Sequence, residues 1–146
     1  MSIHASRFIG RDDREVFFVM CLNTRNNVVA VHRCHVGSLN ASLVHPREVF
    51  KSAILNNAAS VIVAHQHPSD DLLPSKADTM MTDRMNKLCE LMGIPLIDHV
   101  IVGGDNREFF SFKEKELISN PRITLTNDYK TLDFPSPMIA ERGKVR

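Results

Sequence analysis

The sequence VIVAHQHP, residues 61–68, is a short apolar run followed by two histidines that are separated by one residue. An uninterrupted apolar run of this length is typical of a strand that is buried on both faces. Side chains two positions apart on an extended chain point to the same side, so His65 and His67 are expected to reach the same point in space. The sequence therefore predicts a buried strand whose end carries a pair of histidines.

Helical patterns lie on both sides of this strand along the chain. Pro46 suits the first turn of a helix, and apolar residues follow it at helical spacing. The expected buried face of that helix includes Val49, Phe50, Ala53 and Ile54. Ser75 begins a longer helix with a methionine-rich face, and Gly93 suits its end as a cap.

The other apolar runs complete the predicted fold. Further strands are expected at residues 16–22, 28–35, 95–102 and 108–112, of which the first two form a hairpin. Residues 113–118 are expected to form a short helix. Strands and helices in this order predict an α/β fold, a three-layer α/β/α sandwich with a mixed central sheet.

The length of 146 residues suits one compact domain. We expect residues 14–118 to form that domain, after an N-terminal extension of residues 1–13. Beyond Asn120 the periodicity fades and prolines become frequent, so residues 119–146 are expected to form an extended or partly disordered tail.

The amino-acid composition indicates the cellular compartment and the classes of partner to expect. Three cysteines without a C-x-x-C pair are typical of reduced thiols in the cytoplasm, and they exclude a zinc ribbon. No segment has the length and apolarity of a membrane span, and no secretion signal begins the sequence, so we expect a cytoplasmic protein without a membrane partner. Residues 64–120 hold six basic and ten acidic residues, which argues against attraction to a nucleic acid backbone.

The residues that follow the histidine pair indicate that it could bind a metal ion. Asp78 lies one turn into the helix that begins at Ser75, where it can supply a carboxylate oxygen to an ion held by His65 and His67. Two imidazoles and one carboxylate leave a fourth position open for water, which is the pattern of a catalytic zinc site. Zinc lowers the pKa of a bound water to about 7.

Each of these residues also has a structural interpretation. An H-x-H pair by itself is a weak signal. Ser75 and Asp78 match a helix capping box, with aspartate in the usual glutamate position. Three other acidic residues are close enough in sequence to replace Asp78 as a ligand, namely Asp70, Asp71 and Asp83.

The pattern H-x-H-x7-S-x2-D, read from residues 65, 67, 75 and 78, resembles the metal-binding signature of the JAMM/MPN+ metalloproteases. Four blocks resemble one branch of that superfamily, the RadC-like JAB domain, in family order. They are GSLN (37–40), VHPREVF (44–50), NAASVIVAHQHPS (57–69) and LMGIPLIDH (91–99). The resemblance covers roughly residues 13–118.

This resemblance implies a fold and a set of roles. The fold is the JAB/MPN type, which is similar to that of cytidine deaminases, and the ligands of Zn²⁺ are His65, His67 and Asp78. Glu15 matches the family's general acid/base just before the first core strand, with Glu48 as a less suitable substitute. By the same resemblance Ser75 would donate a hydrogen bond to an oxyanion, and the bond cleaved would be an amide or isopeptide bond in a protein or peptide substrate.

The sequence departs from the family pattern at Gln66, which replaces Asn, and at Asp70, which replaces Gly. These changes affect the shape of the loop rather than the ligands. His45 and His99 lie inside the family blocks, and His99 in a strand is more typical of a buried histidine with a hydrogen-bond partner than of a ligand. Family members also carry a helix-hairpin-helix region, so the short stretch before Arg14 resembles a stand-alone short form.

Two other functions remain as alternatives to the zinc-dependent hydrolase. One is a non-catalytic JAB-fold interaction module, against which the retention of all three ligands argues. The other is a metal-dependent enzyme that acts on nucleic acid. The family was named for DNA repair, but the sequence has no nucleic-acid-binding motif, and the H-x-E with P-C-x-x-C signature of the zinc deaminases is missing.

Overall fold

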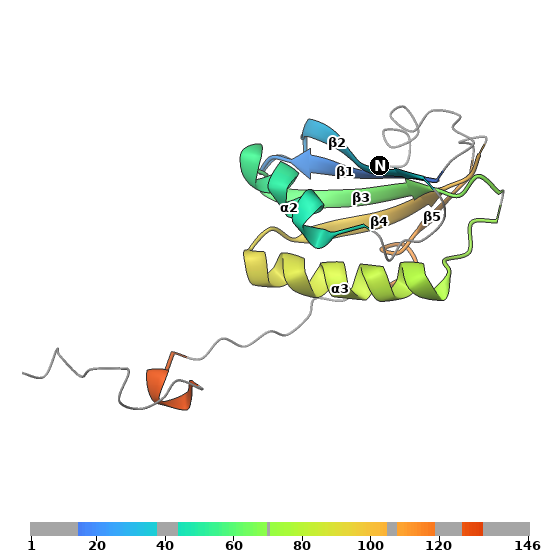
Figure 1. Ribbon diagram of the computed structural model, residues 1–146. Helices are drawn as coiled ribbons and strands as arrows, with labels where there is room; N and C mark the ends of the chain where they lie inside the picture. Colours follow the sequence, from blue (N-terminus) through green and yellow to red (C-terminus); the bar gives the residue numbers. More distant parts are fainter. Residues whose placement is uncertain (1–14, 38–43, 70, 105–107, 119–126, 133–146) are drawn as a thin grey trace, which may run out of the picture.

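In the computed structural model, the described residues are 15–37, 44–69, 71–104, 108–118 and 127–132. They contain a five-stranded mixed sheet (Figure 1). Its strands are β1 (Glu15–Leu22), β2 (Val28–Gly37), β3 (Ser60–Gln66), β4 (Leu96–Val102) and β5 (Phe109–Ser111). They lie in the order β2-β1-β3-β4-β5, with β3 antiparallel to β1 and parallel to β4. The central strand is therefore the buried apolar run that the sequence predicts.

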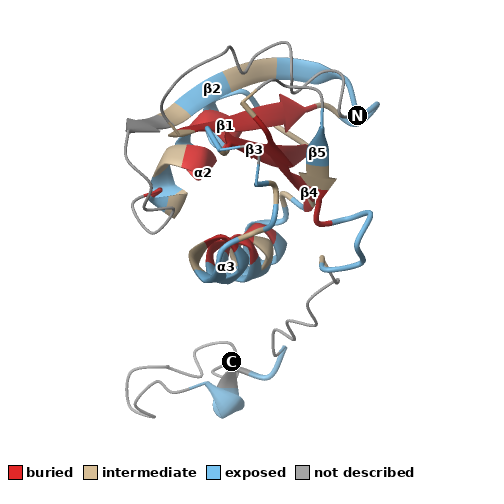
Figure 2. Ribbon diagram, turned by 90° about the vertical axis from the view of Figure 1, so that its right-hand side faces the viewer, coloured by how far each residue is buried: buried red, intermediate tan, exposed pale blue. Residues whose placement is uncertain are grey.

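Two helices of the described ranges pack on the sheet. The predicted helix that begins at proline is α2 (Pro46–Leu55), and the longer one is α3 (Lys76–Met92), which connects the parallel strands β3 and β4. Both pack against the same face of the sheet, as Figure 2 shows from the side. That face collects alternate residues of β1, such as Phe17 and Val19, together with Phe50 of α2 and Met85 of α3.

The opposite face of the sheet is apolar as well. Val16, Phe18 and Met20 of β1 point to it and are buried together with Ile62 and Val100. The predicted α/β fold with a mixed central sheet is confirmed. In the described part of the chain both helices lie on one face of the sheet.

The ends of the helices follow the local sequence signals. His45 is the N-cap of α2, but its side chain makes no capping hydrogen bond. Val49, Phe50 and Ala53 are buried as expected, whereas Ile54 is 57% exposed, so its assignment to the buried face was wrong.

The helix predicted at residues 113–118 is not formed. Residues 112–116 make a series of turns, in which the backbone N–H of Lys113 donates to Asp98 Oδ1 and that of Glu114 donates to Ser111 Oγ. Glu116 then adopts a positive φ of 56°, which a continuing helix does not allow. The backbone N–H of Leu117 donates to the oxygen of Phe112, five residues back, so the chain ends this segment after a single turn, which sequence periodicity does not reveal.

Little of the predicted terminal segments can be compared with the structure. The N-terminal extension lies outside the described residues, as does most of the tail. Within the tail, Tyr129–Thr131 form a single 3-10 turn, η2. The described helices include none with the length and apolar character needed to span a membrane.

The C-cap of α3 offers a direct test of the backbone conformation. Gly93 has φ +69°, and a Cβ added there would meet no atom within 4 Å. Replacing Gly93 with Ala should therefore lower the free energy of unfolding by roughly 1 kcal/mol through backbone strain alone. Gly93→Asn should lose less, because Asn tolerates this conformation better. Urea unfolding of the three proteins would measure the difference, and equal stability of the Gly and Ala forms would contradict the assignment.

Candidate metal centre

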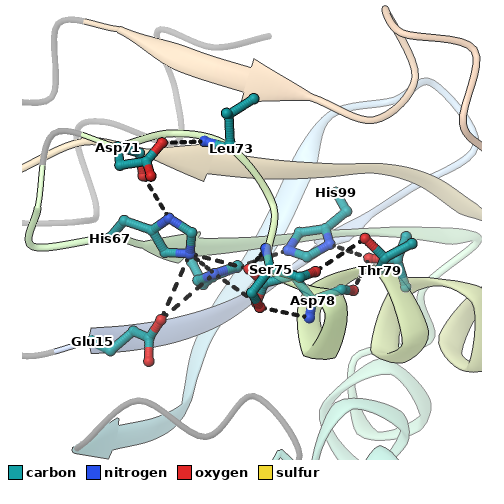
Figure 3. Close-up of polar contacts among 10 residues, drawn as sticks. Glu15, His67, Asp71, Leu73, Ser75, Asp78, Thr79 and His99 are labelled. Carbon is teal, nitrogen blue, oxygen red and sulfur yellow. Dashed lines mark hydrogen bonds and ion pairs between the residues drawn. The ribbon is translucent and has the colours of Figure 1, made fainter.

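Three chain segments converge at one edge of the sheet, as Figure 3 shows. His65 lies near the C-terminal end of β3, and His67 follows that strand. The antiparallel register pairs Phe17 with His65, which brings Glu15, two residues earlier on β1, beside His67. The N-terminus of α3 contributes Asp78 to the same place. The site therefore exists because of the directions in which these strands and this helix run.

The nitrogen and oxygen atoms of these side chains approach one another closely. The Nε2 atoms of His65 and His67 are 2.8 Å apart. Oδ1 of Asp78 lies 3.3 Å from Nε2 of His65, and Oδ2 lies 3.2 Å from Nε2 of His67. Oε1 of Glu15 is 3.8 and 3.7 Å from the same two nitrogens. Glu15, His65 and His67 thus form a cluster that can hold a metal ion.

Asp78 is fixed by the helix that carries it. Its Oδ2 accepts the backbone N–H of Ser75 at 2.8 Å, and its own N–H donates to Ser75 Oγ at 3.1 Å, which completes the predicted capping box. The side chain is only 2% exposed. Burial raises the pKa of this carboxyl, but the interactions with the His65 and His67 imidazoles outweigh that effect and hold the pKa well below its usual range.

His67 has its second ring nitrogen engaged by the loop after β3. Nδ1 lies 2.8 Å from the backbone oxygen of Asp71, and a carbonyl oxygen can only accept, so Nδ1 carries the hydrogen. The Nε2 atom of a neutral His67 therefore presents a lone pair to the cluster. The hydrogen bond with Asp78 raises the pKa of His67 and outweighs the opposing effect of burial.

A chain of buried polar groups lies behind His65. Its Nδ1 is 2.8 Å from Nε2 of His99 on β4, and Nδ1 of His99 is 2.6 Å from the hydroxyl of Thr82 on α3. That hydroxyl donates to the backbone oxygen of Asp78 at 2.7 Å. The ring of His99 is stacked on that of Phe112, with centroids 4.7 Å apart. Burial lowers the pKa of His99 well below its ordinary value.

The residues predicted from the sequence come together, and the alternatives do not join them. Asp83 is exposed and pairs with Lys87, while the side chain of Asp71 accepts the N–H of Leu73. Glu48 lies on α2 and is not part of the cluster. Asp70 is outside the described residues.

Two contributions were not apparent in the sequence. Thr82 stands four residues after Asp78, which is one helical turn further along the same face, but nothing local marks it as a partner of a histidine. The backbone oxygen of Asp71 is invisible to side-chain patterns. Gln66, the departure from the family pattern, is fully buried, and its amide has no hydrogen-bond partner among the described residues.

The chain is similar in sequence to known proteins. Residues 2–117 match the family described as RadC-like JAB domain. A UPF0758 protein of Thermotoga maritima is 47% identical over 103 residues, which are 70% of this chain and 46% of that protein. A UPF0758 protein of Desulforamulus reducens is 49% identical over 106 residues, 73% of this chain and 46% of that protein. The chain thus matches less than half the length of these curated relatives.

Removal of the capping box should lower the stability of the fold whether or not the site is catalytic. Ser75→Ala leaves the N–H of Asp78 without its acceptor and should lower the free energy of unfolding by about 1 kcal/mol. Ser75→Thr keeps a hydroxyl and should retain most of that stability. Thermal unfolding of the metal-free proteins would decide, and an unchanged melting temperature in Ser75→Ala would show that the cap contributes nothing.

Proposed function

The chain belongs to the RadC-like JAB domain family, and on that premise we propose that it is a zinc-dependent hydrolase of amide or isopeptide bonds. His65, His67 and Asp78 are the proposed ligands. Glu15 is the proposed general acid/base, and Ser75 the proposed donor to the oxyanion. The substrate class is protein or peptide.

One observation carries the proposal: among the described residues, no lysine or arginine balances the buried Asp78 carboxylate. Its contacts within the described ranges are two imidazoles and one backbone N–H, with no lysine or arginine among them. A buried carboxylate that lacks a balancing positive charge is costly. A divalent cation between Asp78, His65 and His67 would supply that charge. A proton on His67 is the alternative, so metal and proton are expected to compete for this nitrogen.

The ligand types favour zinc. Two imidazole nitrogens and one carboxylate oxygen form the usual protein ligand set of a catalytic zinc site, whereas magnesium and calcium prefer oxygen ligands. When bound, zinc acts as a Lewis acid that polarises a carbonyl group and makes water more acidic. With three protein ligands in this role, the Glu15 carboxylate remains available for proton transfer.

Glu15 has the position that proton transfer requires. Its Oε1 is 3.7–3.8 Å from the two imidazole nitrogens, a separation longer than a direct hydrogen bond, and its side chain is 12% exposed. A carboxylate placed there can accept a proton from an attacking water and return it to the leaving amine. The N-terminal end of β1 holds it in place, because Glu15 pairs with Gly37 of β2.

Ser75 can combine two roles. Its Oγ accepts the N–H of Asp78, and a hydroxyl that accepts one hydrogen bond can still donate its own hydrogen. A donor fixed at the first turn of a helix costs little reorganisation when negative charge develops on a substrate oxygen. The cap therefore positions the hydroxyl that the reaction would use.

Metal content tests the ligands. Purified wild-type protein should contain close to one zinc per chain, and His67→Ala and Asp78→Ala should each lose most of it, because three protein ligands are needed for tight binding. Asp83→Ala, which removes an exposed carboxylate on the same helix, is the matched control and should keep its zinc. Atomic absorption after dialysis measures the number of zinc ions per chain. A wild type without zinc, or full zinc in His67→Ala and Asp78→Ala, would refute the proposed ligands.

Proton transfer by Glu15 is tested separately. Glu15→Gln should retain zinc but lose hydrolysis by roughly 100-fold or more, because the amide cannot accept the proton. The substrates are libraries of linear and isopeptide-linked peptides, and mass spectrometry of newly formed amines gives the rate. Full activity in Glu15→Gln would assign the base to another group. A zinc-loaded wild type that cleaves neither library would favour the interaction module instead.

A further inference from the structure

We propose that His99 and Thr82 are positioning residues that fix the hydrogen of His65 on Nδ1 and so present its Nε2 lone pair to the metal. This inference rests on the proposed zinc site. It concerns two buried residues behind His65, and it follows from which atoms in the chain of contacts can donate and which can only accept.

The chain of donors begins at Thr82. Its hydroxyl lies 2.7 Å from the backbone oxygen of Asp78, which has no hydrogen to give, so the single hydroxyl hydrogen points to that oxygen. Toward His99 the same hydroxyl can then only accept. The 2.6 Å contact between Thr82 Oγ1 and His99 Nδ1 is therefore a hydrogen bond donated by His99. This places the hydrogen of His99 on Nδ1.

The tautomer of His99 determines which nitrogen of His65 carries the hydrogen. The ring is completely buried, it is stacked on Phe112, and its two nitrogens face a hydroxyl and another imidazole rather than a carboxylate. A positive charge there would lack a partner, so the ring is neutral and its Nε2 carries a lone pair. The 2.8 Å contact with His65 Nδ1 is then donated by His65.

A neutral His65 that has its hydrogen on Nδ1 has a free lone pair on Nε2. That is the atom 3.3 Å from Asp78 and 2.8 Å from Nε2 of His67. Hydrogen bonds at the far nitrogen of a ligating histidine fix the tautomer and ring orientation and raise the basicity of the ligand. Both histidines thus carry the hydrogen on Nδ1 and a lone pair on Nε2, but their Nδ1 atoms donate to different acceptors.

The difference between the acceptors follows from the fold. His67 lies on a loop and uses a free backbone oxygen, that of Asp71. His65 lies in the central strand, where the backbone is paired with β1 and β4 on either side. Its acceptor must therefore be a side chain, and His99 on β4 and Thr82 on α3 supply the path. Thr82 also holds Asp78 through the backbone, so one hydroxyl contacts two ligand-bearing segments.

Loss of the Thr82 hydroxyl should allow the hydrogen of His65 to move from Nδ1 to Nε2. In Thr82→Val, Nδ1 of His99 has no acceptor, so the ring can move its hydrogen to Nε2 and donate to His65. The hydrogen of His65 would then move to Nε2, the atom needed for the metal. We expect zinc affinity to fall roughly 10- to 100-fold, the usual effect of removing such a supporting group.

The experiment compares three variants by competition with a zinc-binding dye. Thr82→Val removes the hydroxyl, and Thr82→Ser restores it. Thr79→Val is the matched control, because the Thr79 hydroxyl donates to Ser75 O with the same spacing on the same helix but has no hydrogen bond with a histidine in the described part of the chain. Long-range 1H–15N correlation spectra of the metal-free proteins report which ring nitrogen of His65 carries the hydrogen. Circular dichroism confirms that each variant is folded.

The inference predicts weaker zinc binding and a shifted His65 tautomer in Thr82→Val alone, with Thr82→Ser and Thr79→Val within about threefold of wild type. Unchanged affinity and tautomer in folded Thr82→Val would overturn it, as would a metal-free wild type whose His65 carries its hydrogen on Nε2. The spectra need no metal. A wild type that binds no zinc therefore refutes the proposed function, whereas the tautomer refutes this inference separately.

Discussion

The whole arrangement depends on β3 being paired on both edges and buried on both faces. Such a strand can carry polar side chains only where other groups meet them, because an unpartnered polar group costs free energy in the interior. From Val61 to Ala64 the strand is apolar, and alternate residues enter the two clusters of the core. At its C-terminal end the requirement changes, since His65 meets His99 on β4 and Asp78 on α3. A single strand therefore contributes core residues at its start and a residue of the candidate metal site at its end.

Strand direction then determines which residues can join His65. The antiparallel neighbour β1 begins where β3 ends, which brings Glu15 to the histidines. The parallel neighbour β4 is reached through α3, and the N-terminus of that helix must lie near the end of β3. A capping box at this point satisfies the helix and aims the Asp78 carboxylate at the same time. Capping and ligand geometry therefore reinforce each other.

Much of this could be predicted from the sequence because the decisive signals are local. An apolar run, an H-x-H pair, a serine cap and a glycine cap each act over a few residues, and the structure has β3, α3 and both caps where these signals lie. In the segment predicted as a helix, Asp98 on another strand accepts the N–H of Lys113, and the chain makes only one turn, which ends at the positive φ of Glu116. The contact between His99 and Thr82 was missed because it depends on how α3 lies over β4. Tertiary partners, rather than local preferences, decide these places.

The distance along the chain between the converging residues has a thermodynamic consequence. His65 and His67 are neighbours in any conformation, but Asp78 reaches them only after α3 has docked, and Glu15 only after β1 has paired with β3. An unfolded chain would offer a metal ion little more than the two imidazoles, whereas the native chain holds all the proposed ligands together. A ligand that prefers the native state stabilises it by mass action, by about 2.7 kcal/mol at a concentration 100 times its dissociation constant. The ion would therefore act as a late-forming crosslink, joining the end of the central strand to the helix that covers it.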